Sequence, residues 1–394
     1  MKINRRIQGL VGSSTLAITA RAKELLSQGK DVVNFAAGEP DFDTPADIKE
    51  AGIKAIRDGF TKYTPTIGIP QLREAIANKF QKDNGLSYKP NEIAVSCGAK
   101  HSIYNIIQVL ADEGEEVIIP SPYWVSYPEM VKISGAQVKI LPTSAADDFK
   151  VTPGALKAAI TPRTKIFILC SPSNPAGSVY SKQELQKIAD LCVANQIYVI
   201  SDEIYEKLVY DQMVYSSIAS LGQQIYTLTI TVNGVSKAYS MTGWRIGYCG
   251  GPATIIDYVN KFQDHSTSNP TSISQMAALA ALKAPESLVK KMCQEFEARR
   301  DLMLKCLDQV SQLTYVRPQG AFYVFCDISQ WGLDASTVAQ RILNEVNVAV
   351  IPGEGFGAPG FIRLSFTTSQ ERIREGVRRI GQWAQQCSVK PVLS

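Results

Sequence analysis

The sequence predicts an α/β fold with a mainly parallel sheet, and three observations support this prediction. Short apolar runs rich in β-branched residues, such as 165–170 and 197–201, have the character of strands buried on both faces. Segment 181–194 between them has the apolar spacing of an amphipathic helix. The later apolar runs at 227–232 and 246–249 are bounded by glycines. Strands that alternate with helices in this way are typical of a parallel sheet covered by helices.

The first part of the chain should contain a helix, a short strand and a rigid loop. Residues 15–28 carry apolar positions at helical spacing, and a strand is expected over 31–37. Glycine and two prolines make 38–45 a fixed loop, and Pro45 suits the first turn of a helix over 46–58. An irregular piece follows at 61–70, and the next expected elements are a helix over 71–82, a strand over 92–96 and a helix over 100–110.

The middle of the chain supplies most of the expected sheet. Its apolar runs are four to six residues long and are separated by segments long enough to cross back over the sheet, as parallel strands require. The strands expected here are 116–119, 138–141, 165–170, 197–201 and 227–232, and a further apolar segment lies at 246–249.

After Pro270 the alternation becomes less regular, which indicates a second, smaller α+β domain. The amino-terminal residues are expected to join it. The expected divisions are 1–47 for the amino-terminal arm and part of the small domain, 48–285 for the large domain and 286–394 for the small domain. The elements expected after Pro270 are helices over 272–284, 286–310 and 370–386 and strands over 321–326, 348–351 and 362–366.

Composition excludes several classes of function. With 394 residues, 45% hydrophobic and 20% charged, the chain has the make-up of an ordinary globular protein large enough for two domains. The net charge of +4 is not gathered into a basic run, so nucleic acid is not an expected partner, although anionic ligands are favoured. No apolar run approaches the length of a membrane span, and a cytoplasmic location is expected.

The cysteines and histidines argue against a metal site. The eight cysteines are scattered singly, without C-x-x-C spacing, and are expected to be reduced thiols. His101 and His265 are the only histidines, which leaves too few ligands for a typical zinc site and little material for a histidine-based triad.

Polar residues follow the expected strands at the edge where sites in open α/β sheets gather. Asp202 ends an apolar run, where an unpaired carboxylate would be costly to bury. A helix cap at a strand end would account for it equally well. Taken in chain order, the residues at these strand ends are Gly98 and Ala99, Asn174, Asp202 with Tyr205, and Ser236 with Lys237.

Lys237 and Arg245 suggest the chemistry of this edge. A lysine among small and apolar neighbours has its pKa lowered by burial, and the neutral amine forms an imine with a carbonyl group. Eight positions later, Arg245 offers a planar cation suited to phosphate. Pyridoxal 5′-phosphate needs both groups. The alternative is that the two residues are ordinary solvated cations near strand ends.

The other residues fit the same cofactor. Asp202 opposite a pyridine nitrogen would keep it protonated, and Tyr205 and Asn174 could hydrogen-bond the phenolic ring oxygen. Asn174 lies in an Asn-Pro-x-Gly run that would also serve as a simple turn. Gly98 and Ala99 precede a helix whose amide groups favour phosphate, a weak signal alone. The run Gly353-x-Gly355-x-Gly357 is followed by Ala358-Pro359-Gly360 and indicates a plain loop, not a dinucleotide site.

These motifs resemble the class I aminotransferases of fold-type I, and in particular the bacterial aspartate aminotransferase subgroup that includes aspartate/prephenate enzymes. The resemblance extends over nearly the whole chain. It rests on Ser236-Lys237-x-x-x-Met241-x-Gly243-x-Arg245-x-Gly247, Gly38-Glu39-Pro40-Asp41-Phe42, Lys62-Tyr63, Pro122-Tyr123-Trp124-Val125-Ser126-Tyr127-Pro128, Asn174-Pro175, Ser201-Asp202-Glu203-Ile204-Tyr205 and Arg363-Leu364-Ser365.

The resemblance implies a large domain with a mainly parallel seven-stranded sheet, pyridoxal phosphate as cofactor, and a role for each matching residue. Lys237 would hold the cofactor covalently and then move the proton between substrate and cofactor. Asp202 would pair with the ring nitrogen, Tyr205 and Asn174 would bind the ring oxygen, and Trp124 would stack on the ring. The phosphate would be held by Gly98, Ala99, Ser236 and Arg245, with Tyr63 reaching it from the neighbouring subunit of a homodimer with shared sites. Position 99 departs from the hydroxylic residue of some relatives, so one phosphate contact is expected to be missing, and Cys97 is assigned no role.

The resemblance also implies the substrate. Arg363 would grip the α-carboxylate, assisted by Asn174 and the Gly38 backbone. A dicarboxylic substrate needs a second site, which the bacterial aspartate subgroup builds from residues matching Lys100 and Thr15. Aspartate and glutamate with their oxo acids are therefore the expected pair, and prephenate is a further candidate acceptor.

Other activities stay open at the level of the sequence. An aromatic preference would be supported by a wall of Trp124, Tyr63 and Phe356. A pyridoxal-dependent lyase would share Lys237 and Asp202 with an aminotransferase. A non-catalytic regulatory domain would usually carry a DNA-binding segment in front, and only short, uncharacteristic sequence precedes Gly38.

Overall fold

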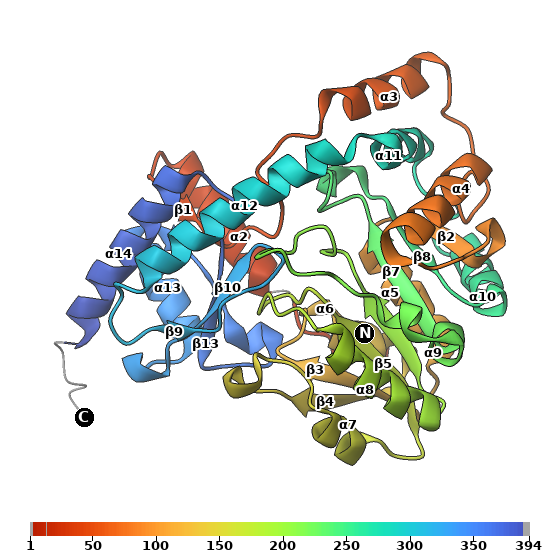
Figure 1. Ribbon diagram of the computed structural model, residues 1–394. Coiled ribbons are helices and arrows are strands. Elements are labelled where there is room, and N and C mark those ends of the chain that lie inside the picture. The colour runs from red at the N-terminus through yellow and green to blue at the C-terminus, as the bar shows by residue number, and fades with distance from the viewer. Residues whose placement is uncertain (1–2, 13, 389–394) are drawn as a thin grey trace.

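The computed structural model describes residues 3–12 and 14–388, and its centre is a seven-stranded sheet (Figure 1). The strand order is β2-β8-β7-β6-β5-β3-β4. Neighbours from β7 to β4 are parallel, while β8 runs antiparallel to both β2 and β7. The mainly parallel sheet is thereby confirmed. The strands are β2 (Ile93–Ser96), β3 (Glu116–Ser121), β4 (Gln137–Pro142), β5 (Thr164–Cys170), β6 (Tyr198–Asp202), β7 (Thr229–Gly234) and β8 (Gly247–Gly250).

Helices cover both faces of this sheet, because the central strands are apolar on both sides. Along β5, Ile166 and Ile168 pack into a cluster with one set of helices, whereas Phe167 and Leu169 pack into the cluster on the opposite face. The first cluster includes side chains of α5 (Ala99–Leu110), α6 (Ser126–Ser134) and α10 (Ala253–Asp264), and the second those of α7 (Pro153–Ala159), α8 (Lys182–Ala194) and α9 (Gln223–Leu228).

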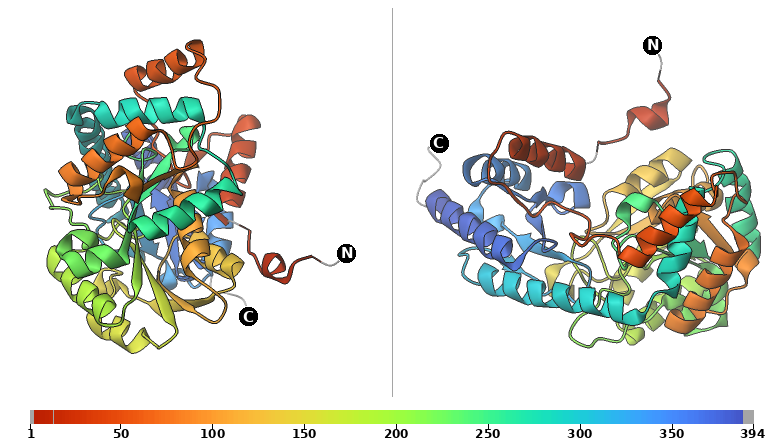
Figure 2. Two further views of the ribbon diagram at one scale, coloured as in Figure 1. Left: turned by 90° about the vertical axis from the view of Figure 1, so that its right-hand side faces the viewer. Right: turned by 90° about the horizontal axis from the view of Figure 1, so that it is seen from above.

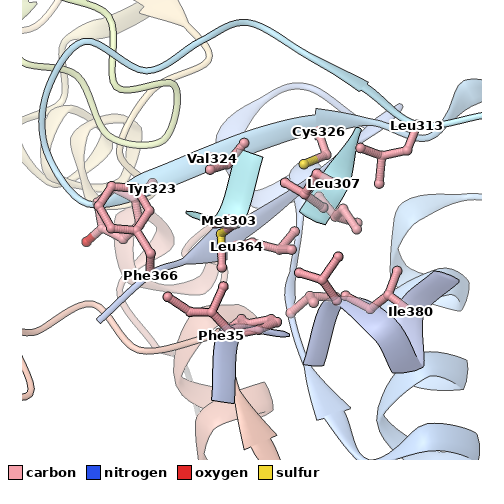
Figure 3. Close-up of a cluster of buried hydrophobic side chains, with 14 of the residues drawn as sticks. Phe35, Met303, Leu307, Leu313, Tyr323, Val324, Cys326, Leu364, Phe366 and Ile380 are labelled. Carbon is pink, nitrogen blue, oxygen red and sulfur yellow. The ribbon is translucent and has the colours of Figure 1, made fainter. Parts of the chain in front are cut away.

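A second, antiparallel sheet has the order β12-β13-β10-β9. Its large apolar cluster includes Phe35, Met303, Leu364 and Ile380, which come from four distant parts of the chain (Figure 3). The strands are β9 (Thr314–Tyr315), β10 (Tyr323–Asp327), β12 (Ile351–Pro352) and β13 (Phe361–Ser365), and the helices beside them are α12 (Glu286–Leu307), α13 (Ala335–Val346) and α14 (Gln370–Ser388).

The amino-terminal residues Val33 and Phe35 pack into the same apolar cluster. Strand β1 (Val33–Asn34) pairs in parallel with β11 (Val348–Ala349). The expected strand over 31–37 is shorter than predicted, because the carbonyl of Phe35 accepts from the amide of Ser365 and that of Ala36 from the side chain of Arg363. The division of the chain into domains at residues 47 and 285 stays a prediction.

The remaining helices lie along one side of the large sheet and at the amino terminus. Helix α3 (Ala46–Arg57) packs on α11 (Ser272–Lys283), and α4 (Pro70–Lys79) continues into a π-helical turn, η1 (Phe80–Asn84). Helix α1 (Arg5–Gln8) extends from the body ahead of α2 (Ser14–Ser27) (Figure 2). Among the described residues, no helix combines the length and apolar character needed to cross a membrane.

Candidate active site

The polar residues predicted at the strand ends meet at one edge of the large sheet. Strands β5, β6 and β7 are parallel, so the segments that follow them emerge together. Strand β8 begins at the same edge, because Gly247 lies opposite both Gly234 of β7 and Ser96 of β2. The antiparallel strand therefore brings Arg245 beside the loop after β2.

Lys237 occupies the centre of this edge. It is partly buried, and its Nζ donates to the carbonyl oxygen of Gly38 at 2.5 Å. The same nitrogen lies 5.8 Å from the ring centre of Tyr205. Burial lowers the pKa of Lys237 to about 8, and the charge of Arg363 acts in the same direction. A substantial fraction of the amine is therefore neutral near physiological pH.

Asp202 is a buried carboxylate held by hydrogen bonds. It is 5% exposed, and Tyr127 donates its hydroxyl to the Asp202 Oδ2 at 2.6 Å. Burial raises the pKa of Asp202, while the bond from Tyr127 and the charge of Lys237 act against the rise. No ion pair to Asp202 occurs within 3–12 and 14–388, so the site suits a cationic ring nitrogen.

Arg363 is a buried cation with a free donor. It comes from β13, is 2% exposed, and donates to Asn174 Oδ1 at 3.0 Å and to the carbonyl oxygen of Ala36 at 3.1 Å. Its Nε is buried without a hydrogen-bond partner. The Tyr323 ring lies 4.2 Å from the guanidinium carbon. A buried guanidinium with an unused donor and neutral partners suits the carboxylate of a ligand.

Gly98 and Arg245 form an anion cradle with the start of α5. Gly98 has φ of 91°, and a Cβ at this position would lie 2.3 Å from the Arg245 guanidinium. Ala99 begins α5, and the backbone of Gly247 approaches it so closely that a Cβ there would lie 2.0 Å from the Ala99 nitrogen. A free helix amino terminus beside a guanidinium favours a phosphate.

Lys100 and Trp124 lie at the mouth of the site. The Lys100 Nζ lies 4.9 Å from the ring centre of Trp124, and both burial and the charge of Arg245 lower the pKa of Lys100. A cavity of about 620 Å³ opens here, lined among others by Lys100, Arg245, Tyr123 and Lys132. The side chain of Lys100 thus lies beside Arg245 and Trp124 in a cavity that adjoins the cradle.

One predicted residue, Tyr63, is exposed in the described chain, and another, Thr15, has no described side chain. Tyr63 is 92% exposed and lies between α3 and α4, away from the cradle. Thr15 lies in α2, but its side chain falls outside the described part of the structure. Ser236, by contrast, is buried directly before Lys237, and Tyr205 is 4% exposed.

Two tyrosines in the site were not assigned roles from the sequence. Tyr127 follows Trp124 by three residues, a spacing that would place both on the same face of a helix. The spacing could therefore have indicated that Tyr127 lies at the site, and the two rings are in contact. Tyr323 shares a hydrogen bond of 2.9 Å between its hydroxyl and that of Tyr205. It comes from β10, so only the packing of the second sheet against the first reveals it. No group of three or more metal-ligating side chains occurs in the described chain.

In three comparisons with known proteins, the chain matches aminotransferases. A family model described as aminotransferase class I and II matches residues 30–380. The chain is 49% identical to an aspartate aminotransferase of Geobacillus stearothermophilus, over 96% of this chain and 98% of that protein. It is 43% identical to an aspartate/prephenate aminotransferase of Nitrosomonas europaea, over 96% of this chain and 99% of that protein. The structure of the Thermus thermophilus aspartate aminotransferase with maleate is similar, with a TM-score of 0.93, 44% identity, and coverage of 97% of this chain and 99% of that chain.

Proposed function

Because this chain belongs to the class I and II aminotransferases, we propose that it transfers the amino group of L-aspartate to 2-oxoglutarate with pyridoxal 5′-phosphate as cofactor. The products would be oxaloacetate and L-glutamate. The observation that carries the proposal is the convergence of Lys237, Asp202 and Arg363 on one site, where an amine of lowered pKa adjoins a buried carboxylate and a buried guanidinium.

The residues present fit the cofactor. Asp202, buried without an ion pair in the described chain, would meet the ring nitrogen, and the Gly98–Arg245 cradle would take the phosphate. When bound, pyridoxal phosphate supplies an electron sink for negative charge at the substrate α-carbon. The other expected contacts come from Tyr205, Asn174 and Trp124 to the ring and from Ala99 and Ser236 to the phosphate.

The chain's own residues then divide the remaining work. The neutral Nζ of Lys237 would accept the proton from the substrate α-carbon and deliver it to the C4′ atom of the cofactor, a task suited to a base with a pKa near the working pH. Arg363 binds the α-carboxylate through its unused Nε and its terminal nitrogens, and Asn174 fixes the plane of the guanidinium.

A second carboxylate of the substrate would be bound by Lys100, with Thr15 beside it. Lys100 reaches into the mouth of the site next to Trp124, and no carboxylate of the described chain neutralises it. The Thermus structure that this chain resembles was obtained with maleate, which carries two carboxylates. Prephenate is proposed as a further acceptor, because Lys100 and Thr15 occur together and because several relatives are aspartate/prephenate aminotransferases.

An aromatic amino acid is the alternative substrate. Phe356 is fully buried and lies 5.1 Å from the Arg363 guanidinium carbon, so one apolar wall exists. The Lys100 side chain over the Trp124 ring places a positive charge beside the other aromatic residue of this wall, which favours a dicarboxylate. A pyridoxal-dependent lyase is the less favoured alternative, since the relatives named above are aminotransferases.

A homodimer with shared sites is also proposed. Tyr63 is 92% exposed, and the neighbouring helix α3 exposes Ile53 and Ile56. Large apolar side chains left in solvent on one segment are characteristic of an interface. In a dimer formed through this segment, Tyr63 would reach the phosphate cradle of the partner subunit.

A panel of amino donors and acceptors tests the proposal. The purified protein, supplied with pyridoxal phosphate, is expected to convert aspartate and 2-oxoglutarate to oxaloacetate and glutamate with a higher kcat/KM than it shows for phenylalanine. Formation of prephenate's amino product would identify the further acceptor. A higher kcat/KM for phenylalanine would establish the aromatic alternative, and release of ammonia from one amino acid without an oxo acid would indicate a lyase.

Lys100→Ala is expected to separate the two substrate classes. Loss of a charged hydrogen-bond donor should lower kcat/KM for aspartate about 10–100-fold, whereas phenylalanine has no second carboxylate and should lose little. Lys132→Ala is the matched control, because Lys132 lines the same cavity but pairs with Glu129 at 2.8 Å. Equal losses on aspartate and phenylalanine would remove Lys100 from substrate recognition.

A further inference from the structure

The turn that carries Asp202 and Tyr205 has a second buried face. Side chains alternate along β6, so Glu203 lies on the side of Ser201, opposite to Asp202. The Ser201 hydroxyl donates to Glu203 Oε1 at 2.9 Å, and Glu203 is fully buried. A buried glutamate one residue from the proposed partner of the ring nitrogen therefore faces away from the site.

Glu203 and Glu206 share a hydrogen-bond partner, Asn84, which lies in the turn that ends α4. The amide of Asn84 donates to Glu206 Oε2 at 2.6 Å and to Glu203 Oε2 at 3.2 Å. Lys79 donates to Asn84 Oδ1 at 2.7 Å and forms an ion pair with Glu206. The Ser217 hydroxyl donates to Glu203 at 2.6 Å, and the side chain of Tyr215 is hydrogen-bonded to the same carboxylate. One amide thus joins both carboxylates of the turn.

The π-helical turn η1 presents this amide. Asn84 is its last residue and precedes Gly85, whose φ of 68° ends the helix. Asn84 is 8% exposed, so its bonds to the two glutamates are shielded from water. Single π turns are frequent at functional sites, and here the turn places a buried donor behind the edge of the sheet that carries Asp202.

The backbone of the turn transmits the position of these glutamates. The Glu206 amide donates to the Glu203 carbonyl oxygen at 3.0 Å, and the Leu208 amide to that of Tyr205 at 2.8 Å. The Glu203 amide also donates to Val232 of the neighbouring strand at 2.9 Å. A displaced Glu203 side chain would therefore move Asp202 and Tyr205 with it.

The charge balance of this face keeps it sensitive to protonation. Burial raises the pKa of Glu203 to about 7, and the charge of Glu206 adds to the rise, while Lys79 acts against it. Two carboxylates bound to one amide favour a single negative charge between them. The other titratable groups that face the pair are Tyr88, Tyr215, Tyr239, Tyr248 and Asp83, and Lys207 pairs with Asp83.

We propose that Glu203 and Glu206 are positioning residues that, through Asn84 and Lys79, hold the turn presenting Asp202 and Tyr205 to the cofactor. This inference rests on the proposed function, because it assumes that Asp202 and Tyr205 contact the cofactor ring. It assigns the second glutamate-bearing face of the turn a role in the geometry of the site in addition to its contribution to stability.

The test compares two buried glutamates of the same sheet. Glu116 is 4% exposed and accepts bonds from Thr161, Lys139 and Arg163, but it lies at the opposite end of β3. Glu203→Ala and Glu116→Ala are both expected to lower Tm. Only Glu203→Ala should weaken pyridoxal phosphate binding, by about tenfold or more, and shift the pH midpoint of the visible absorption band of the complex.

Conservative variants keep the comparison decisive. Glu203→Gln retains the volume and the acceptor oxygen for Ser201 and Ser217 but loses the acceptor that faces Asn84, so it should recover the affinity and the midpoint only in part. If Glu203→Ala does not fold, Glu206→Gln takes its place and should show a smaller change in the same direction. If Glu203→Ala showed the same cofactor affinity and the same pH midpoint as Glu116→Ala, the inference about Glu203 and Glu206 would be overturned and the proposed function would stand. A wild-type protein unable to bind pyridoxal phosphate would overturn the proposed function with it.

Discussion

Lys237→Ala is expected to abolish transamination while the protein still binds pyridoxal phosphate. The variant loses the only amine that lies beside both Asp202 and Arg363 in the described chain, and a positioned base contributes about 10²–10⁴-fold to a proton transfer. The Gly98–Arg245 cradle and Asp202 are untouched, so cofactor affinity should persist. Single-turnover kinetics with aspartate and an absorbance titration with pyridoxal phosphate measure the two effects separately.

The control for this variant is another lysine of the chain. Lys261 is largely exposed and pairs with Asp257 at 2.6 Å on α10, so Lys261→Ala should keep native turnover. Addition of a small primary amine to Lys237→Ala should recover part of the rate, because the cavity left by the side chain can admit it. Near-native transamination by Lys237→Ala without such an amine would remove Lys237 from the reaction.

Asp202→Ala is expected to lower kcat by about 10²–10³-fold with a smaller change in KM. The carboxylate is buried and meets no cation of the described chain, so its charge is available to the ring nitrogen of the cofactor. Without that charge the negative charge at the substrate α-carbon is stabilised less, and proton removal slows. A larger kinetic isotope effect on kcat with aspartate deuterated at the α-carbon would show that proton removal has become rate-limiting.

Tyr127→Phe is the matched control, since it removes the 2.6 Å hydrogen bond that orients Asp202, together with a contact to the Cys170 thiol, and leaves the carboxylate in place. The kcat of Tyr127→Phe should fall about tenfold or less, which corresponds to the loss of one hydrogen bond to a charged group. Asp202→Ala with an unchanged kcat and a raised KM would contradict the assigned role, because the residue would then act only in binding.

The sequence predicted the parts of the site that follow from strand periodicity. Asp202 and Lys237 directly follow apolar strands, and parallel strands bring their carboxyl ends to one edge, so their meeting needed no knowledge of distant contacts. The neighbours from α5 could be predicted for the same reason, because Gly98 and Ala99 mark a strand-to-helix turn.

Other parts depend on contacts between distant segments. Strand β8 looks like any other apolar run, and its antiparallel direction follows from the short connection to β7 that carries Lys237 and Arg245. Tyr323 reaches Tyr205 only because the second sheet packs beside the first. The π turn at Phe80–Asn84 could not be predicted from the local sequence, because the residues that Asn84 contacts, Glu203 and Glu206, are distant in the chain.

Helix α6 shows a different kind of omission. Its range Ser126–Ser134 contains Pro128, which argues against a helix when it is considered in isolation. The proline falls in the first turn, where its missing amide proton is not needed, and the helix ends at Gly135 with φ of 94°. This helix positions Tyr127 beside Asp202. Because the helix was not predicted from the sequence, the hydrogen bond from Tyr127 to Asp202 was not predicted either.

One measurement tests the central claim most directly. The protein is mixed with pyridoxal phosphate, reduced with sodium borohydride, digested and analysed by peptide mass spectrometry, which locates any lysine bonded to the cofactor. The account predicts a pyridoxyl group on Lys237 in the wild-type protein and none in Lys237→Ala. A pyridoxyl group on Lys100 or on another lysine, with Lys237 unmodified, would contradict it.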